Sequence, residues 1–392
     1  FEVMQKAASA CFYYIMKNIQ FKKVLIICGP GNNGGDGLLI AKHFNKKNKN
    51  VTIFAPLQLG KTKDSKKALE ELQSFNLIKK KINIDEFDLI IDSLFGVGLN
   101  QPLSSELYSL LNKINNTKIK IVSIDMPSGI FTDTGQMGSI AVKASTTLTF
   151  HRLKPGLLLL PGKEYAGQIE ILDIQLANLD NETNMLLLAS PTIKKARISD
   201  NKFNRGTTFI VAGRKLIGAS KLAALAASQA SLRAGAGLSK IFVHEGEENF
   251  FRPHILEEML VTYKNFNHLM KIIQNTHISC LVYGCGIDIT SQNKEFLRFL
   301  LQQKFDVVLD ASVFSLMTEN KEIFFESLKN RKAETVLTPH RGEFKRVFHC
   351  SDDKIKDSLQ ASKQTNSIIL YKGNDTVIAS PEGEIYINYK YY

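Results

Sequence analysis

Several patterns are missing from this 392-residue chain, and their absence excludes whole classes of protein. Its five cysteines form no C-x-x-C pair, which argues against a disulfide framework or a zinc site and for reduced thiols in a cytoplasm. Its longest apolar runs, such as 157–160 and 24–28, are far too short to span a membrane. No signal-like segment is visible at its start. We therefore expect a cytoplasmic protein with no membrane partner.

Arginine is also scarce, with 10 Arg against 40 Lys, although the formal net charge is +12. Surfaces that bind nucleic acid usually cluster their positive charge and favour arginine for bases and phosphates. Here the lysines are scattered among Asn and Ile, and runs such as 79–81 and 46–50 are typical of solvated turns after helices. We expect no nucleic-acid partner.

Two series of apolar, β-branched segments alternate with helical patterns, which predicts two α/β units with parallel sheets covered on both faces. The strands expected in the first half are 22–28, 51–56, 88–92, 119–125 and 145–150, with helices at 64–75 and 104–114. Those expected in the second half are 207–213, 238–244, 280–286, 305–312, 335–344 and 367–373, with a helix at 219–237 and a hairpin at 376–388. Such sheets bind ligands at the carboxyl ends of their strands.

A glycine-rich loop, 29-GPGNNGGDG-37, stands between the first predicted strand and a helix. It is not a Walker A sequence, because no GK[ST] follows. Its position still suits a nucleotide or another phosphate-bearing ligand, since the first N–H groups of a helix attract anions. The alternative is a tight turn that serves only the fold.

Three aspartates are expected at the same edge of the first sheet: Asp36 in the loop, and Asp92 and Asp125 at strand ends. One such residue alone is better explained as a helix cap. Three together favour a ligand site. The oxygens of Asn33, Asp92 and Ser128, with a single firm negative charge, suit a weakly charged hard cation better than zinc or copper.

The motifs GPGNNGGDG, DSLFGVGL and DMPSG, in this order and spacing, resemble the NAD(P)H-hydrate epimerase family over about residues 3–175. That family interconverts the R and S forms of NADH or NADPH hydrated at C6 of the nicotinamide ring. The resemblance implies that Asp125 contacts the ring as acid/base catalyst, and that K⁺ binds to Asn33, Asp92 and Ser128. It implies that the hydrated dinucleotide contacts Asn32, Asn33, Gly34, Gly35, Asp36, Gly96, Val97, Gly98, Leu99, Asn100, Gln101, Pro102 and Asp125.

The second half has motifs of its own at predicted strand ends, namely 284-GCG-286, 338-TPHRGEF-344 and 372-KGNDT-376. His340 in such a place is as readily structural as catalytic. The ammonium of Lys372 is placed to meet a phosphate. The small residues of helix 219–237 permit close packing on the sheet and, at its start, the approach of a ligand.

In their order these motifs resemble the ADP- or ATP-dependent NAD(P)H-hydrate dehydratase family, a ribokinase-like fold. Such an enzyme phosphorylates the C6 hydroxyl, and loss of phosphate restores the nicotinamide. The resemblance implies ADP or ATP with Mg²⁺ as the second substrate. It implies that Ala219, Gly286 and His340 line the hydrate site and that the nucleotide contacts Lys372, Gly373, Asn374, Asp375 and Thr376.

The GSGD-type loop of that family, whose N–H groups and aspartate serve phosphoryl transfer, has no counterpart here. No glycine follows Gly383 and no aspartate follows Asp375. We therefore expect an incomplete ribokinase-like domain with little or no dehydratase (lyase) activity.

The overall expectation is an α/β protein of nicotinamide nucleotide repair with an active epimerase (isomerase). It has a Rossmann-like three-layer domain at 1–176, a linker at 177–200 and the incomplete ribokinase-like domain at 201–392. The resemblance also implies a homo-oligomer. Two alternatives stay open: a non-catalytic dinucleotide-binding or scaffold protein, and a small-molecule kinase of the ribokinase-like group. The preference between NADH and NADPH is left undecided.

Overall fold

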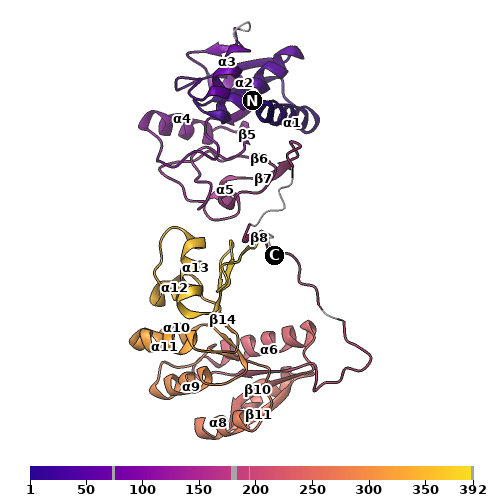
Figure 1. Ribbon diagram of the computed structural model, residues 1–392, viewed down its shortest axis with the longest axis vertical. Helices are drawn as coiled ribbons and strands as arrows, with labels where there is room; N and C mark the ends of the chain where they lie inside the picture. The colour runs from indigo at the N-terminus through magenta and orange to yellow at the C-terminus, as the bar shows by residue number, and fades with distance from the viewer. Residues whose placement is uncertain (73–75, 178–182, 194, 390–392) are drawn as a thin grey trace. The chain divides into compact units, whose positions relative to one another are not determined.

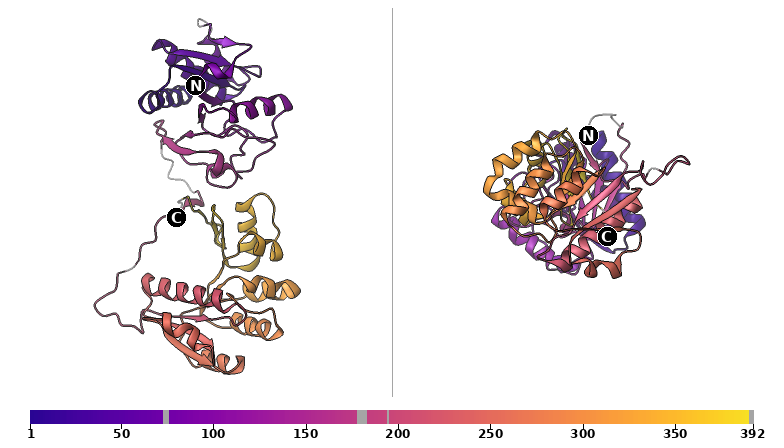
Figure 2. Two further views of the ribbon diagram at one scale, coloured as in Figure 1. Left: turned by 180° about the vertical axis from the view of Figure 1, so that it is seen from behind. Right: turned by 90° about the horizontal axis from the view of Figure 1, so that it is seen from below.

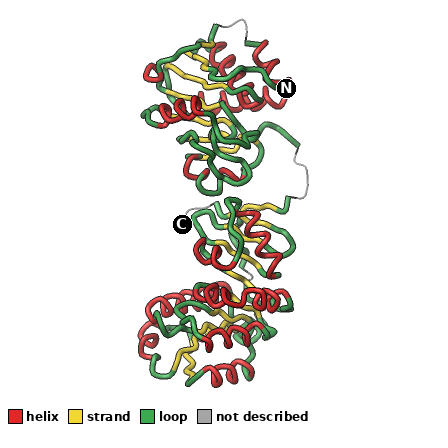
Figure 3. The backbone as a smooth tube through the Cα atoms, turned by 90° about the vertical axis from the view of Figure 1, so that its left-hand side faces the viewer, coloured by secondary structure: helices red, strands yellow, loops and turns green. Residues whose placement is uncertain are grey.

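The computed structural model describes residues 1–72, 76–177, 183–193 and 195–389. The chain divides into two compact units, Phe1–Glu182 and Thr183–Tyr392. In both units strands run between helices (Figure 3), as the predicted α/β class requires. No helix in the described part of the chain has both the length and the apolar character of a membrane span.

The first unit is a parallel seven-stranded sheet with the order β3-β2-β1-β4-β5-β6-β7. Figure 1 labels β5, β6 and β7 of this sheet. Its strands are β1 (Lys23–Cys28), β2 (Asn50–Phe54), β3 (Ile78–Lys79), β4 (Leu89–Ser93), β5 (Lys120–Ile124), β6 (Thr146–Phe150) and β7 (Gln168–Leu172). Its helices are α1 (Glu2–Asn18), α2 (Asn32–Lys46), α3 (Lys63–Glu70), α4 (Ser105–Asn115) and α5 (Gly162–Tyr165), with 3₁₀ turns η1 (Ile84–Glu86) and η2 (Pro155–Leu157).

Both faces of this sheet are buried, which gives three layers. In β1, Val24 and Ile26 pack with side chains of α1, α2 and α3, while Leu25 and Ile27 pack with side chains of α4. Successive residues of a strand point to opposite faces, so a continuous apolar run such as VLIIC is what a doubly covered parallel strand needs.

The second unit has a ten-stranded sheet with the order β11-β10-β9-β12-β13-β14-β15-β16-β17-β8, parallel except for the β15-β16-β17 meander. Its strands are β8 (Met185–Leu187), β9 (Thr207–Val211), β10 (Leu238–His244), β11 (Met259–Tyr263), β12 (Cys280–Tyr283), β13 (Asp306–Leu309), β14 (Thr335–Leu337), β15 (Ile368–Tyr371), β16 (Val377–Ala379) and β17 (Ile385–Ile387). Its helices are α6 (Ile217–Ala234), α7 (Glu248–Phe251), α8 (Phe266–Gln274), α9 (Ser291–Leu301), α10 (Ser312–Met317), α11 (Lys321–Lys329), α12 (Arg341–Val347) and α13 (Lys354–Thr365), with η3 (Arg252–His254) and η4 (Thr318–Asn320).

Helices again lie on both faces of this sheet (Figure 2). Phe209 and Phe242 belong to the large core that includes side chains of α8 to α13, whereas Ile210 and Ile241 pack against α6 and α7.

The range 177–200, predicted as a linker, contains a strand of the second sheet. β8 pairs with β17, the outer strand of the C-terminal hairpin. An unpaired outer strand leaves a row of N–H and C=O groups open, and β8 satisfies those of β17.

Candidate active site at the carboxyl edge of the first sheet

The first sheet has its topological switch point between β1 and β4, because the chain continues from β1 to β2 on one side and returns to β4 on the other. Ligands of such sheets bind in the crevice formed there by the two loops. Gly29, after β1, donates a hydrogen bond to the carbonyl of Ser93, at 3.0 Å. A Cβ on Gly29 would lie 1.6 Å from the carbonyl oxygen of Leu94, so only glycine lets the two loops meet.

Asn33, in the first turn of α2, is buried at this switch point with its amide unused. Neither Nδ2 nor Oδ1 has a hydrogen-bond partner in the described part of the chain. A Cβ on Gly96 would lie 3.3 Å from Asn33 Cβ and 3.1 Å from Asp125 Oδ2, so the side chains of Asn33 and Asp125 both lie close to Gly96. An unpaired buried amide costs free energy, and a ligand that bonds to it removes this cost.

Asp92, at the end of β4, anchors the loop that follows β5. Its Oδ1 accepts from Ser128 Oγ at 2.6 Å and Leu94 N at 3.3 Å, and its Oδ2 accepts from Ser123 Oγ at 2.8 Å and Ser128 N at 2.9 Å. Burial raises the pKa of Asp92, and the hydrogen bonds oppose this effect. A carboxylate accepts about four hydrogen bonds, so Asp92 has few lone pairs left in this arrangement.

Asp125 follows β5 with a left-handed backbone, φ +66°. Such a conformation is uncommon outside glycine and recurs at active sites. Its Oδ1 forms an ion pair with Lys154 Nζ at 2.8 Å. Lys154 is held in turn by Thr149 Oγ1 at 2.8 Å and the carbonyl of Phe150 at 2.9 Å. Lys154 was not among the predicted site residues.

Asp36 supplies a third carboxyl to the same region, after Asp92 and Asp125. It is 8% exposed and makes no hydrogen bond or ion pair with the residues that the structure describes. Burial, together with the charge of Asp125, raises the pKa of Asp36 well above its ordinary value. Besides the hydrogen-bonded Asp92, the site therefore holds two carboxyls in unlike settings: Asp125 is paired with an ammonium, and Asp36 has no cation among the described residues.

Of the remaining predicted residues in this half, some pack against other parts of the protein and the others are exposed to solvent. Asn32 is exposed and accepts a hydrogen bond from Thr62. A Cβ on Gly35 would lie 2.8 Å from Met4 Sδ, so this glycine serves the packing of α1 on α2. A Cβ on Gly34 would overlap the carbonyl of Gly29. The predicted loop residues that follow Gly96 lie mainly at the surface: Val97, Gly98, Leu99, Asn100, Gln101 and Pro102.

In the second unit, Gly286 packs against the start of α6, the helix that includes Ala219. Gly286 has φ +72°, and a Cβ there would lie 2.7 Å from the Cβ of Ser220, the neighbour of Ala219. His340 is exposed and caps α12, because its Nδ1 accepts from Gly342 N at 2.9 Å and Glu343 N at 3.3 Å. His340 therefore has a structural role as a helix cap, which is one of the two roles that the sequence left open for it.

The predicted nucleotide residues follow β15. Lys372 Nζ donates to Asp310 Oδ1 at 2.6 Å, which joins the ends of β15 and β13. Asp375 forms an ion pair with Lys354 at 2.6 Å, and Thr376 Oγ1 donates to the carbonyl of Gly373 at 2.7 Å. Asn374, the remaining predicted residue here, is exposed. Sequence reasoning did not find Asp310 or Lys354, although Asp310 lies within the predicted strand 305–312 and directly follows β13.

Comparisons with known proteins match both units. Residues 1–156 match the family model described as YjeF-related protein N-terminus, and residues 208–390 match the one described as NAD(P)H-hydrate dehydratase. The chain is 29% identical to the bifunctional NAD(P)H-hydrate repair enzyme of Dictyoglomus turgidum, over 98% of this chain and 80% of that protein. It is 30% identical to the bifunctional NAD(P)H-hydrate repair enzyme of Thermofilum pendens, over 93% of this chain and 73% of that protein.

Among solved structures, an ADP/ATP-dependent NAD(P)H-hydrate dehydratase of Bacillus subtilis, co-crystallised with ATP and Mg²⁺, is 22% identical. The match covers 50% of this chain and 67% of that chain, with a TM-score of 0.39.

Proposed function

Since the chain belongs to the family of bifunctional NAD(P)H-hydrate repair enzymes, we propose that its first unit epimerises C6-hydrated NAD(P)H between Asp36 and Asp125. For the second unit we propose that it takes the S epimer and dehydrates it with ADP or ATP, as the match to the dehydratase family model supports. The expectation of little or no dehydratase activity, drawn from the missing GSGD-type loop, is the alternative that the nucleotide-dependent assay decides. The observation that carries the first assignment is the cluster of Asn33, Asp36, Gly96 and Asp125 at the switch point of the first sheet.

Epimerisation at C6 needs two proton transfers. The C6 hydroxyl is on a carbon bonded to N1, so the nitrogen lone pair expels it once the hydroxyl is protonated. The C6–O bond breaks, water leaves and an iminium bond forms between N1 and C6. Water then adds to the opposite face and gives up a proton, which completes a balanced exchange. One group must therefore donate a proton while another accepts one.

Asp36 and Asp125 suit these two roles because their surroundings differ. Asp125, paired with Lys154, is the carboxylate that takes a proton from the entering water. Asp36, whose pKa burial and the charge of Asp125 raise, is the carboxylic acid that protonates the leaving hydroxyl. Two titratable groups in unlike environments are a recurring basis for acid and base assignments. In the reverse direction the two exchange roles.

Lys154 is a positioning residue in this proposal. It bonds to Asp125, Thr149 and the carbonyl of Phe150, so it fixes the carboxylate against β6. We propose that the pyrophosphate of the dinucleotide binds at the start of α2, which begins after Gly31 without a side-chain cap. The first N–H groups of a helix have no intrahelical partner and attract anions.

Oxygen atoms near Asn33 and Ser128 are suitable ligands for a potassium ion. The buried and unpaired Oδ1 of Asn33 is a neutral oxygen ligand, and the carbonyl of Phe95 and the hydroxyl of Ser128 lie 3.2 Å from one another. Asp92 would supply the single negative charge and orient Ser128, to which it is bonded. A bound K⁺ would supply positive charge beside the proposed substrate site.

The proposed ion site predicts an effect of Asn33→Ala. Without this oxygen, the half-saturating K⁺ concentration for epimerisation should rise at least about tenfold, the equivalent of about 1.4 kcal/mol. Potassium should also raise the melting temperature of the wild-type chain, because an ion that binds only the folded state stabilises it, and this shift should shrink in Asn33→Ala. Asn112→Ala, at an exposed asparagine of α4, is the control. An unchanged potassium dependence in Asn33→Ala would remove this residue from the ion site.

For the second unit, we place the transferred phosphoryl group near Lys372, whose ammonium joins the ends of β15 and β13. An ammonium neutralises phosphate charge in this type of reaction. The same family resemblance leads us to propose a homo-oligomer, which sedimentation equilibrium would test.

The experiment that tests the proposed function is chromatography of pure R hydrate of NADH incubated with the purified chain and K⁺. Formation of the S hydrate without nucleotide is the expected result for the first unit. Formation of NADH from the S hydrate only after ATP or ADP is added is the expected result for the second unit. Binding of either hydrate without any conversion would favour a non-catalytic dinucleotide-binding protein.

A further inference from the structure

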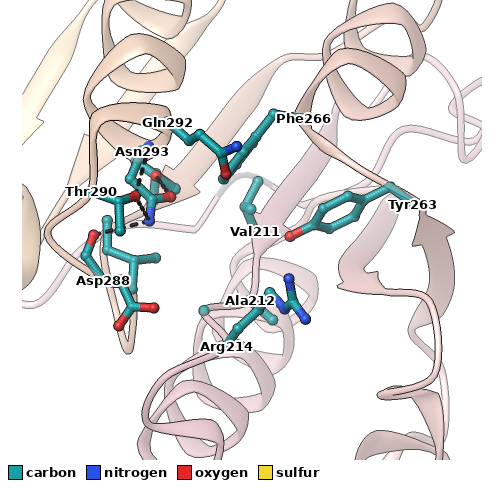
Figure 4. Close-up of a pocket in the computed structure, with 12 residues that line it drawn as sticks. Val211, Ala212, Arg214, Tyr263, Phe266, Asp288, Thr290, Gln292 and Asn293 are labelled. Atoms are coloured by element: carbon teal, nitrogen blue, oxygen red, sulfur yellow. Dashed lines mark hydrogen bonds between the residues drawn. The ribbon is translucent and has the colours of Figure 1, made fainter.

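We infer that a small cavity in the second unit, at the switch point between β9 and β12, binds the purine base of the hydrated dinucleotide. The cavity has a volume of about 100 Å³ and lies between the loop after β9, the end of β11 and the start of α9 (Figure 4). The inference rests on the proposed dehydratase function, since it assigns one part of that enzyme's substrate to a place in the chain.

The position of the cavity is that of a ligand site. From β9 the chain continues to β10 and β11 on one side, and it returns to β12 on the other. The residues that follow these two central strands, Gly213 and Arg214 after β9 and Ile287 and Asp288 after β12, line the cavity. Crevices of this kind receive ligands in open parallel sheets.

Tyr263 gives independent evidence that the cavity is built for a ligand. The side chain comes from the last residue of β11, is only 3% exposed and points its hydroxyl into the cavity (Figure 4). This hydroxyl has no hydrogen-bond partner in the part of the chain that the structure describes. Burial and the nearby charge of Glu247 raise the pKa of Tyr263 to about 12, so the hydroxyl stays a donor. The ring is therefore buried while the hydroxyl faces the cavity, where its O–H is open to a ligand.

The lining favours a flat heteroaromatic ring. Tyr263 and Phe266 have ring centroids 6.3 Å apart and form one wall, and Tyr283 lies deeper, 1% exposed. The hydroxyl of Tyr283 is already used, because it donates to Asn293 Oδ1 at 2.7 Å. The volume exceeds that of one water molecule, about 30 Å³, and suits a single ring system that enters edge first.

The wall opposite Tyr263 carries polar groups that can bond to a heterocycle. Thr290 caps α9, and Asn293 in the first turn of that helix donates to the carbonyl of Asp288 at 2.9 Å. The amide of Gln292, which carries both a donor and an acceptor, lies at the rim (Figure 4). Arg214 forms an ion pair with Glu247 at 3.0 Å, and Asp288 Oδ1 lies 3.7 Å from Lys215 Nζ, so both charged side chains of the lining have a counter-ion. A neutral base is therefore a better occupant than a phosphate.

The distance to the proposed reaction centre distinguishes the two bases of the dinucleotide. Lys372 follows β15, which is three strands from β12 in the sheet order. Neighbouring strands are about 4.8 Å apart, so the cavity is about 14 Å from the strand that carries Lys372. The hydrated nicotinamide must be at the reaction centre, and the pyrophosphate linkage lets the purine reach a site at this separation.

The test is fluorine NMR of the full chain labelled with 3-fluorotyrosine, which places one probe on each of the eleven tyrosines. The resonance of Tyr263 is identified by its loss in Tyr263→Phe. Titration with AMP should shift this resonance in a saturable manner, and titration with reduced nicotinamide mononucleotide should not. A shift caused only by the nicotinamide compound, or by neither compound, would overturn the assignment.

Kinetics give a second readout. In Tyr263→Phe the KM for the S hydrate of NADH should rise about tenfold, because one hydrogen bond is lost. The KM for the hydrate of the adenine-free mononucleotide should stay unchanged. Tyr386→Phe, at a tyrosine of β17 whose hydroxyl lies near the exposed Glu384, is the matched control. If AMP shifts the Tyr263 resonance but no dehydration occurs, the cavity assignment stands and only the proposed dehydratase function fails.

Discussion

Replacing Asp125 with asparagine should lower the rate of interconversion of the R and S hydrates at least about a thousandfold, within the range expected when an acid/base group is lost. Asn has nearly the same shape and can still accept a hydrogen bond from Lys154, so the loop after β5 should keep its structure. What the variant lacks is a group that takes a proton from the entering water. The loss should therefore fall on kcat, with little change in KM.

The matched control is Asp133→Asn, an exposed aspartate in the loop that follows the same strand. It should epimerise the hydrates at the wild-type rate. Wild-type activity in Asp125→Asn would show that this carboxylate does not act as the base. Unchanged urea unfolding of both variants would show that the difference is chemical.

Replacing Asp36 with asparagine should reduce kcat about a hundredfold and change its pH dependence. The wild-type reaction requires Asp36 in its protonated form, so its rate should decline as pH rises through the raised pKa of this carboxyl. In Asp36→Asn that decline should be absent. A rate profile whose alkaline limb is the same in both proteins would contradict the role of Asp36 as the acid.

The same substitution has an effect on stability with a defined sign. Because burial and the charge of Asp125 raise the pKa of Asp36 in the folded chain, the folded state binds more protons than the unfolded state above about pH 4. The contribution of Asp36 to the free energy of unfolding is therefore full at low pH and is lost as pH rises through the raised pKa. Urea unfolding at pH 5 and pH 8 should show a smaller loss of stability in Asp36→Asn than in the wild type. An equal loss in both would contradict this account of Asp36.

The α/β class and the central strands were predictable because buried parallel strands are continuous apolar runs. The strands that sequence reasoning missed are β3, β7, β8 and β11, and these are the outer strands of the two sheets. An outer strand has one neighbour and more exposed side chains, as in the half-exposed QIEIL of β7. Its apolar signal is correspondingly weak.

The candidate site was predictable where motifs follow strands, and Asn33, Gly96 and Asp125 do lie together. Lys154 was missed because it is 29 residues from Asp125 in sequence and meets it only through the pairing of β5 with β6. The glycine loop was interpreted as a cradle for a ligand. The structure adds that Gly29 and Gly35 are needed for contacts within the protein, which no local pattern reveals. The functional roles of the named residues stay predictions.

The most direct test of the proposed mechanism is epimerisation of the R hydrate of NADH in water enriched in ¹⁸O, with mass spectrometry of both hydrates at early times. In the proposed mechanism the original oxygen at C6 leaves as water, and a solvent water adds in its place. Each newly formed S hydrate should therefore carry one ¹⁸O. After the enzyme-free background is subtracted, the rate of ¹⁸O incorporation should equal the rate of conversion of R to S hydrate. Asp125→Asn should lose both the incorporation and the conversion. Formation of S hydrate that retains its original oxygen would contradict the mechanism, because the C6–O bond would then have stayed intact.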